Sequence, residues 1–247
     1  MRIWLYDGTF ESFLTALSLA LERAEACAIA REGGAGAEAG LFSEFVKAGT
    51  DPARAAAMRE FFEKRGSAES WHHARYAFLS EVSGAEDAVL AYARLIIEKG
   101  RAADDLLADD RVKKIHGLSA SVGGEAHMFK GFVRFKELAD KTLYARIEPE
   151  HNILPLLTGH FRDRLGEFNW IIHDARRGRA ALCSGGRLVY APITQERALE
   201  FAGGEAGVQA LWRHFFKTAA IKERTNPKLQ RQNVPLKYRK NLTEFEP

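Results

Sequence analysis

The chain has 247 residues, of which 46% are hydrophobic and 28% charged, and its formal net charge is +3. This composition predicts one or two domains with a sizeable core and excludes a globally disordered chain. No apolar run approaches the roughly 20 residues that a membrane-spanning helix needs, and Asp7 interrupts the first apolar run too early for a signal peptide. We therefore expect a cytoplasmic protein that makes no membrane contact.

The first residues predict a strand and then a helix. Arg2–Tyr6 is a short apolar run, and after a possible cap at Thr9 the apolar side chains recur at helical spacing as far as Leu21. The Gly- and Ala-rich stretch Gly33–Gly40 has neither the Lys-Ser/Thr pair of a phosphate-binding loop nor the spacing of a dinucleotide fingerprint, so we interpret it as a plain linker.

Helical patterns predominate between residues 51 and 123. Asp51 followed by Pro52 is typical of a helix start, and Gly100 is typical of a helix end. A further helix is predicted over Asp104–Gly123, because its acidic residues come first and its basic residues follow, which complements the helix dipole. The acidic run therefore needs no metal ion to explain it.

After Gly123 and Gly124 the pattern changes from helical to strand-like. The expected elements are strands over Met128–Phe135 and Leu143–Ile147, a helix over Pro155–Leu165, strands over Trp170–His173, Ala180–Cys183 and Leu188–Ala191, and a helix over about Arg197–Glu223. The prolines at 227 and 235 are expected to end regular structure. Together these elements predict an α+β fold in one domain, residues 1–247: an N-terminal βα unit, a helical insert at about 50–123, an antiparallel sheet meander and a C-terminal helix with a basic tail.

Neither the histidines nor the cysteines predict a metal or cofactor site. His72 and His73 are adjacent, so they share a helix face poorly, and no other histidine pair has a recognised ligand spacing. Cys27 and Cys183 fit neither a disulfide framework nor a Cys-x-x-Cys pair, and we expect both to be buried. The chain also lacks the Cys-x-x-x-Cys-x-x-Cys spacing of an iron–sulfur cluster. We expect no metal and no cofactor.

Two residues are weak catalytic candidates. His160 and Asp174 lie in segments dense in arginine, where a carboxylate could orient a phosphate-bearing substrate or act as a general base. Asp174 could equally cap the turn that follows it and pair with Arg176 or Arg177. Glu125 and His127 would project from one face of the expected strand, which allows contact without indicating a function.

The charges are distributed very unevenly. The tail Arg213–Lys240 holds nine Lys/Arg and one acid, a net charge of +8, so the rest of the chain carries −5. Aromatic residues alternate with these cations, as in His214–Lys217 and at Tyr238. Cations neutralise phosphates and exposed aromatic rings stack on unpaired bases, so the tail suggests contact with nucleic acid. In the alternative reading, Phe215 and Phe216 belong to the core and the cations form a solvated face.

Several longer strings resemble one family of proteins. The strings are YDGTFESF (residues 6–13), GGEAHMFKGFVRF (123–135), YARIEPEHNILPLLTGHFRDR (144–164), WIIHDARR (170–177) and NPKLQRQNVPLKYRKNLTEF (226–245). They resemble the uncharacterised bacterial family labelled probable DNA metabolism protein, the domain-of-unknown-function 4130 family. The positions that match its motifs are His127, Lys130, Gly131, Arg134, His160, Phe161, Arg164, Trp170, Asp174, Arg177, Asn226, Pro227, Pro235 and Tyr238.

The resemblance implies a companion role in DNA repair. Members of that family are associated with a neighbouring radical-SAM protein of supposed DNA modification or repair, and their domain is also found joined to domains similar to uracil-DNA glycosylase. The family offers no catalytic residues to transfer. The radical chemistry would belong to the partner, which agrees with the missing cluster-binding cysteines.

The leading expectation is a DNA-binding accessory protein that presents nucleic acid to a partner radical-SAM protein. The residues expected to bind nucleic acid are Arg134, Arg164, Arg177, Lys217, Lys222, Arg224, Lys228, Arg231, Lys237, Tyr238, Arg239 and Lys240. Two alternatives stay open: a nucleic-acid hydrolase or base-excision-type enzyme that uses Asp174 and His160, and a protein-binding adapter whose tail docks on an acidic partner.

Overall fold

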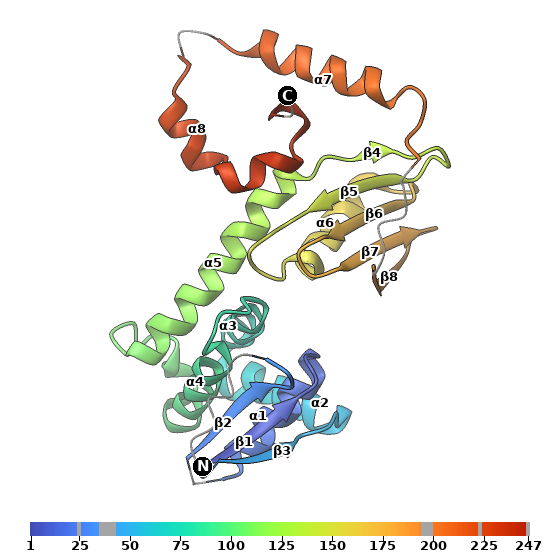
Figure 1. Cartoon of the computed structure of the whole chain (residues 1–247). Coiled ribbons are helices and arrows are strands. Elements are labelled where there is room, and N and C mark those ends of the chain that lie inside the picture. Colours follow the sequence, from blue (N-terminus) through green and yellow to red (C-terminus); the bar gives the residue numbers. More distant parts are fainter. Residues whose placement is uncertain (24–25, 35–42, 194–199, 222–223, 246–247) are drawn as a thin grey trace. The chain divides into compact units, whose positions relative to one another are not determined.

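The computed structural model (Figure 1) describes residues 1–23, 26–34, 43–193, 200–221 and 224–245. The fold is α+β, as the sequence predicts. The chain divides into two compact units, Met1–Gly124 (unit 1) and Glu125–Pro247 (unit 2). The prediction of a single domain with a helical insert stays a prediction.

Unit 1 begins with the expected strand and helix. The strand is the middle one of a small parallel sheet. The sheet order is β2-β1-β3, and Arg2 pairs with Cys27 on one side and with Glu44 on the other. The two outer strands are not predicted, because they are only five and four residues long. The elements are β1 (Arg2–Tyr6), α1 (Phe10–Leu21), β2 (Cys27–Arg31), β3 (Glu44–Lys47), α2 (Pro52–Glu60), the π-helical turn η1 (Phe61–Gly66), α3 (Ala68–Leu79), α4 (Ala85–Lys99), the 3-10 turn η2 (Gly100–Ala103) and the start of α5 (Asp110–Phe132).

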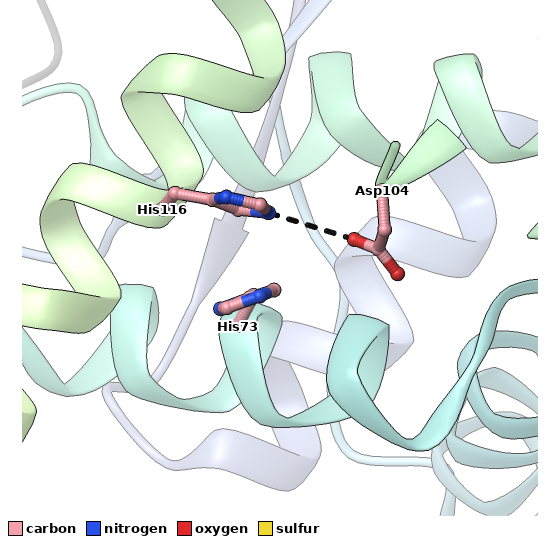
Figure 2. A group of neighbouring side chains, drawn as sticks. All are labelled: His73, Asp104 and His116. Carbon is pink, nitrogen blue, oxygen red and sulfur yellow. Dashed lines mark ion pairs between the residues drawn. The ribbon is translucent and has the colours of Figure 1, made fainter. Parts of the chain in front are cut away.

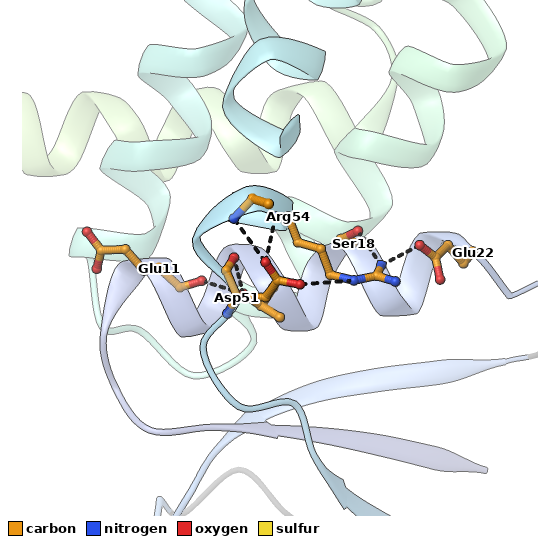
Figure 3. Close-up of polar contacts among 7 residues, drawn as sticks. Glu11, Ser18, Glu22, Asp51 and Arg54 are labelled. Atoms are coloured by element: carbon orange, nitrogen blue, oxygen red, sulfur yellow. Dashed lines mark hydrogen bonds and ion pairs between the residues drawn. The ribbon is translucent and has the colours of Figure 1, made fainter. Parts of the chain in front are cut away.

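The predicted helix start at Asp51 is confirmed, and it also fastens α2 to α1 (Figure 3). The Asp51 carboxylate accepts hydrogen bonds from the backbone N–H groups of Ala53 at 2.9 Å and Arg54 at 3.2 Å. The Arg54 guanidinium then donates to Ser18 Oγ on α1 at 3.1 Å and pairs with Glu22, the residue that caps the end of α1. One local capping motif therefore also fixes a long-range helix contact.

The helix predicted over Asp104–Gly123 is wrong in its bounds, and the strand predicted over Met128–Phe135 is wrong, because one long helix, α5, continues to Phe132. The buried residues Val122, Ala126 and Phe129 of α5, and Val133 just after it, recur at helical spacing rather than at every second position. The glycines at 123 and 124 do not interrupt it. Consequently Glu125 and His127 do not share a strand face.

Unit 2 contains a five-stranded sheet of order β4-β5-β6-β7-β8. The predicted antiparallel meander is confirmed for β6, β7 and β8, but β5 and β6 are parallel and α6 connects them, which the sequence does not predict. The elements are β4 (Lys136–Glu137), β5 (Leu143–Ile147), α6 (Leu154–Leu165), β6 (Trp170–Asp174), β7 (Arg179–Ser184), β8 (Arg187–Pro192), α7 (Glu205–Ala219), α8 (Pro227–Asn233), and the 3-10 turns η4 (Leu236–Asn241) and η5 (Thr243–Phe245).

The C-terminal part of unit 2 differs from prediction in two ways. Within the described residues the last long helix covers only α7, and Phe201 instead forms an antiparallel bridge with Leu138. Pro227 does not end regular structure but starts α8, where the Asn226 side chain accepts a hydrogen bond from the Leu229 N–H at 3.0 Å. Proline is well tolerated in a first helical turn, because its missing N–H has no partner there.

Other expectations concern single features. Cys183 is buried as predicted, whereas Cys27 is only partly buried, and both are free thiols. The predicted linker Gly33–Gly40 lies largely outside the described residues. In the described part of the chain, no helix has both the length and the apolar character that crossing a bilayer requires.

Candidate nucleic-acid interface

Six of the residues predicted to bind nucleic acid are instead engaged inside unit 2. Arg134, which follows α5, forms a two-pronged ion pair with Glu244, at 2.6 Å between Nη2 and Oε1 and 3.1 Å between Nε and Oε2. Trp212 of α7 donates its indole N–H to the same carboxylate at 3.0 Å. The Arg134 guanidinium also lies 5.5 Å from the centre of the Trp212 ring. These contacts connect α7 to the C-terminal residues, and they occupy the Arg134 guanidinium within unit 2.

The guanidinium of Arg177 is likewise bonded to groups of unit 2. Its Nη1 lies 3.0 Å from Oδ2 of Asp174, whose side chain is fully buried. The guanidinium also donates to the backbone oxygens of Pro149 at 3.2 Å and Glu150 at 2.7 Å. Arg177 therefore ties the β6–β7 turn to the loop after β5.

The end of the basic tail is packed on unit 2. Tyr238 is 6% exposed and donates its hydroxyl to Glu125 of α5 at 2.5 Å. Lys237 pairs with Glu150 at 2.6 Å, and Lys240 pairs with Glu148. Arg239 donates to the Val234 backbone oxygen and covers the Phe245 ring at 4.5 Å. This part of the tail neutralises acidic residues of the protein's own body.

Five of the remaining predicted cations are exposed. Four of these, which we call the α7–α8 cations, lie on the two helices or between them: Lys217 on α7, Arg224 between α7 and α8, and Lys228 and Arg231 on α8. No ion pair joins any of them to an acidic residue that the structure describes. Arg164, at the end of α6, is likewise exposed. Lys222 lies outside the described residues.

The α7 helix also presents an apolar face to solvent. Leu211 is 71% exposed and Phe215 is 59% exposed, and the neighbouring Val208 and Trp212 complete the same face at helical spacing. Phe216 is borderline exposed and touches Phe245 with 5.7 Å between ring centres. The reading of Phe215 and Phe216 as core residues is therefore wrong. Unit 2 displays aromatic rings and free cations on one stretch of chain.

A family model described as a domain of unknown function, DUF4130, matches residues 83–244, more than half of the chain. The chain belongs to the DUF4130 family. No curated protein and no solved structure matches it. The DUF4130 match includes α4, α5 and the described elements of unit 2 from β4 to η4, so it covers all of the α7–α8 cations.

In this DUF4130 chain the two weak catalytic candidates have separate surroundings. Oδ1 of Asp174 accepts the backbone N–H groups of Arg176 at 3.1 Å and Arg177 at 3.3 Å, which is the turn-capping arrangement. Burial raises the pKa of Asp174, and the paired Arg177 opposes that shift. His160 is on α6, where its Nε2 is buried without a hydrogen-bond partner and its ring meets the edge of Phe161. No hydrogen bond or ion pair connects the two candidates in the described residues.

A hollow of about 350 Å³ in unit 1 involves none of the predicted site residues. It lies at the carboxyl ends of β1 and β2, an edge where parallel sheets commonly place ligands. Tyr6, Arg31 and Glu86 are among its lining residues, and the Tyr6 hydroxyl donates to Glu86 at 2.7 Å. Burial, then the Glu86 carboxylate, raises the pKa of Tyr6. The lining therefore mixes acidic and basic groups and does not form a uniformly positive surface.

The Arg134–Glu244 pair predicts a pH dependence of stability. Burial raises the pKa of Glu244, but hydrogen bonds from Arg134 and Trp212 outweigh that effect and lower the pKa below its ordinary value of 4.5. A lowered carboxyl pKa stabilises the fold above the ordinary value, and this stabilisation is lost as the pH falls through the folded-state pKa. We expect Glu244→Gln to lower the thermal unfolding midpoint at pH 7 and to differ progressively less from wild type below about pH 4.5. A difference that is constant across this range would contradict the assignment.

Proposed function

We propose that this protein is a DNA-binding accessory component that presents nucleic acid to a partner enzyme. The observation that carries the proposal is the division of the basic tail. Lys237 and Lys240 are neutralised by the protein's own acids, while the α7–α8 cations are exposed and form no ion pair with any acid that the structure describes. Unpaired surface cations in this density attract a polyanion, because binding releases the counterions condensed on phosphates.

The exposed aromatic face favours single-stranded or locally unpaired DNA. Phe215 lies on α7 two residues from Arg213 and two residues from Lys217, so a stacking group and phosphate-binding groups alternate along the sequence of this helix. Each base stacked on an aromatic side chain contributes about 1–3 kcal/mol. A duplex offers no free base face, so this contribution is confined to unpaired strands. We place Arg134, Arg177 and Tyr238 outside the proposed surface, because their polar groups are already bonded within unit 2.

The partner is proposed from the sequence resemblance, which implies a radical-SAM protein of DNA modification or repair. In this arrangement the companion carries out the radical chemistry and the present chain holds the strand. The α7–α8 cations bind the backbone, and Arg164 adds a further contact if the strand extends along α6.

Matched lysine pairs test the DNA surface. Fluorescence anisotropy with a labelled single strand and a duplex, at several salt concentrations, compares Lys217→Ala/Lys228→Ala with Lys237→Ala/Lys240→Ala. Both variants remove two positive charges, so their effects on long-range attraction are equal. We expect the first variant to lower the slope of log affinity against log salt by about 1.4 on the single strand, at about 0.7 per phosphate contact. We expect a clearly smaller change for the second. Absence of binding at low salt, or equal losses in both variants, would contradict the proposal.

A second pair of variants separates stacking from protein docking. Phe215→Ala is expected to weaken single-strand binding about 5- to 150-fold, the equivalent of one lost stack, with little effect on duplex. Leu211→Ala changes an even more exposed residue on the same face that cannot stack, and it should leave DNA affinity unchanged.

The adapter alternative is supported by the same exposed apolar face and predicts a different result. If α7 docks on a protein, Leu211→Ala and Phe215→Ala should weaken capture of the radical-SAM partner to a similar extent, and nuclease treatment should not release that partner. The hydrolase alternative predicts turnover of damaged oligonucleotides by the purified chain, with loss of turnover in His160→Ala.

A further inference from the structure

The helical part of unit 1 brings together three side chains that the sequence places far apart. His73 comes from α3, Asp104 follows η2 and His116 comes from α5. One potential ligand atom from each lies within 4.8 Å of the others (Figure 2). The sequence predicts no metal because no two of these residues have a ligand spacing along one helix. Tertiary packing creates the grouping.

One ring nitrogen of each histidine in this cluster lacks a hydrogen-bond partner. Nδ1 of His73 and Nε2 of His116 are buried from water, and neither forms a hydrogen bond with any residue that the structure describes. Nε2 of His116 faces Oδ1 of Asp104 at 3.7 Å, too long for a hydrogen bond. Buried polar atoms are normally satisfied, so two unsatisfied nitrogens beside one carboxylate call for a missing ligand.

The carboxylate is held in place by three hydroxyl groups. Oδ2 of Asp104 accepts from Ser67 Oγ at 2.7 Å and Ser70 Oγ at 2.6 Å, and Oδ1 accepts from the Tyr92 hydroxyl. Such outer contacts fix the orientation of a metal-binding carboxylate and are typical of built sites. They still leave Oδ1 facing the histidines.

The two imidazoles lie close to each other in the packed structure. The ring centres of His73 and His116 are 4.1 Å apart. Neutral imidazole and ionised carboxylate are the forms of these side chains that bind metals.

We propose that His73, Asp104 and His116 form a binding site for a divalent transition-metal ion. Two imidazoles and one carboxylate are the ligand set of zinc sites with an open fourth position, and of non-haem iron sites. Tetrahedral zinc with bonds of about 2.0–2.1 Å places its ligand atoms about 3.3 Å apart. The His116–Asp104 pair, at 3.7 Å, is already close to this separation. Three protein ligands leave a coordination position for water or a substrate atom.

The proposal does not depend on the DNA-binding function, because the cluster lies in unit 1 and the α7–α8 cations lie in unit 2.

Metal loading tests the site. Purified, tag-free protein is loaded with Zn²⁺ and dialysed, and its metal content is measured by mass spectrometry. Co²⁺ loading then reports ligand number and geometry through its visible absorption. The variants are His73→Ala and His116→Ala, with His72→Ala as the matched control. His72 is exposed on the same helix and stacks on Tyr76 at 3.9 Å between ring centres, outside the cluster.

We expect wild type and His72→Ala to retain one Zn²⁺ per chain, and to show the intense absorption of four- or five-coordinate Co²⁺. His73→Ala and His116→Ala should lose both. Tyr92→Phe, which removes a hydroxyl that positions Asp104, should weaken metal affinity about 10- to 100-fold. Circular dichroism checks that each variant is folded. If the ligand variants do not fold, the test rests on the wild-type protein. The proposal is overturned if wild type retains no Zn²⁺ after dialysis, or if its Co²⁺ spectrum is that of the fully hydrated ion. Equal metal loss in His72→Ala overturns it as well.

Discussion

Replacing Glu125 with alanine is expected to destabilise unit 2 by about 3 kcal/mol or more. This carboxylate is 3% exposed and accepts three hydrogen bonds: the Glu150 backbone N–H at 2.7 Å, the His151 backbone N–H at 2.7 Å and the Tyr238 hydroxyl at 2.5 Å. Alanine would leave three buried donors without an acceptor, and each such loss costs about 1–3 kcal/mol. Burial, and then the Glu125 carboxylate, raise the pKa of Tyr238, so the phenol stays a donor.

Glu150→Ala is the matched control for this experiment. The Glu150 side chain is half exposed and pairs with Lys237, so its removal should cost about 0–1 kcal/mol. The backbone N–H that binds Glu125 is unaffected. Urea unfolding followed by circular dichroism measures both free energies of unfolding. Similar values for Glu125→Ala and Glu150→Ala would show that the buried carboxylate does not anchor the tail.

Replacing Asp174 with alanine is the second large effect, with an expected loss of about 3–5 kcal/mol. Asp174 is fully buried, and its removal takes away the carboxylate that lies 3.0 Å from the guanidinium of Arg177, whose side chain is 11% exposed. Breaking one side of a buried ion pair typically costs this much. The turn after β6 also loses an acceptor for two backbone N–H groups.

A double-mutant cycle distinguishes this structural role from a catalytic one. Asp174→Ala and Arg177→Ala should each be strongly destabilising, and the double variant should cost clearly less than the sum, because neither charge is then left unpaired. DNA affinity of the folded single variants should equal that of wild type. Additive losses in stability would mean that the ion pair contributes little, and a loss of turnover without a loss of stability would favour the hydrolase alternative.

Local signals predict the helix boundaries well. Thr9, Asp51 and Gly100 mark helix ends where expected, because capping depends on backbone groups only a few residues away. The continuation of α5 through two glycines is missed, since glycine only weakens a helix and tertiary packing of Ala126 and Phe129 compensates for it. The parallel pairing of β5 with β6 is missed as well, because strand partners are chosen by long-range contacts.

The candidate site shows the same limit of local reasoning. Counting charges locates the tail but does not distinguish Lys228, which is exposed and unpaired, from Lys240, which pairs with Glu148. That distinction depends on acids more than 90 positions away in the chain. Glu125 and the His73–Asp104–His116 cluster are likewise invisible to spacing rules, because their partners come from separate elements. The sequence predicts the helix that contains α7, but not that its apolar side chains are exposed.

The openness of α7 has a consequence for local stability. Of its 15 residues only Glu205 is buried, so tertiary packing supplies little of the free energy that keeps this helix formed. Isolated helices of about this length are marginal in water. We therefore expect the amide hydrogens of α7 to exchange with solvent much faster than those of β6 and β7. A ligand that settles on this helix would have to order it as well as contact it, and part of the contact energy would be used for that ordering.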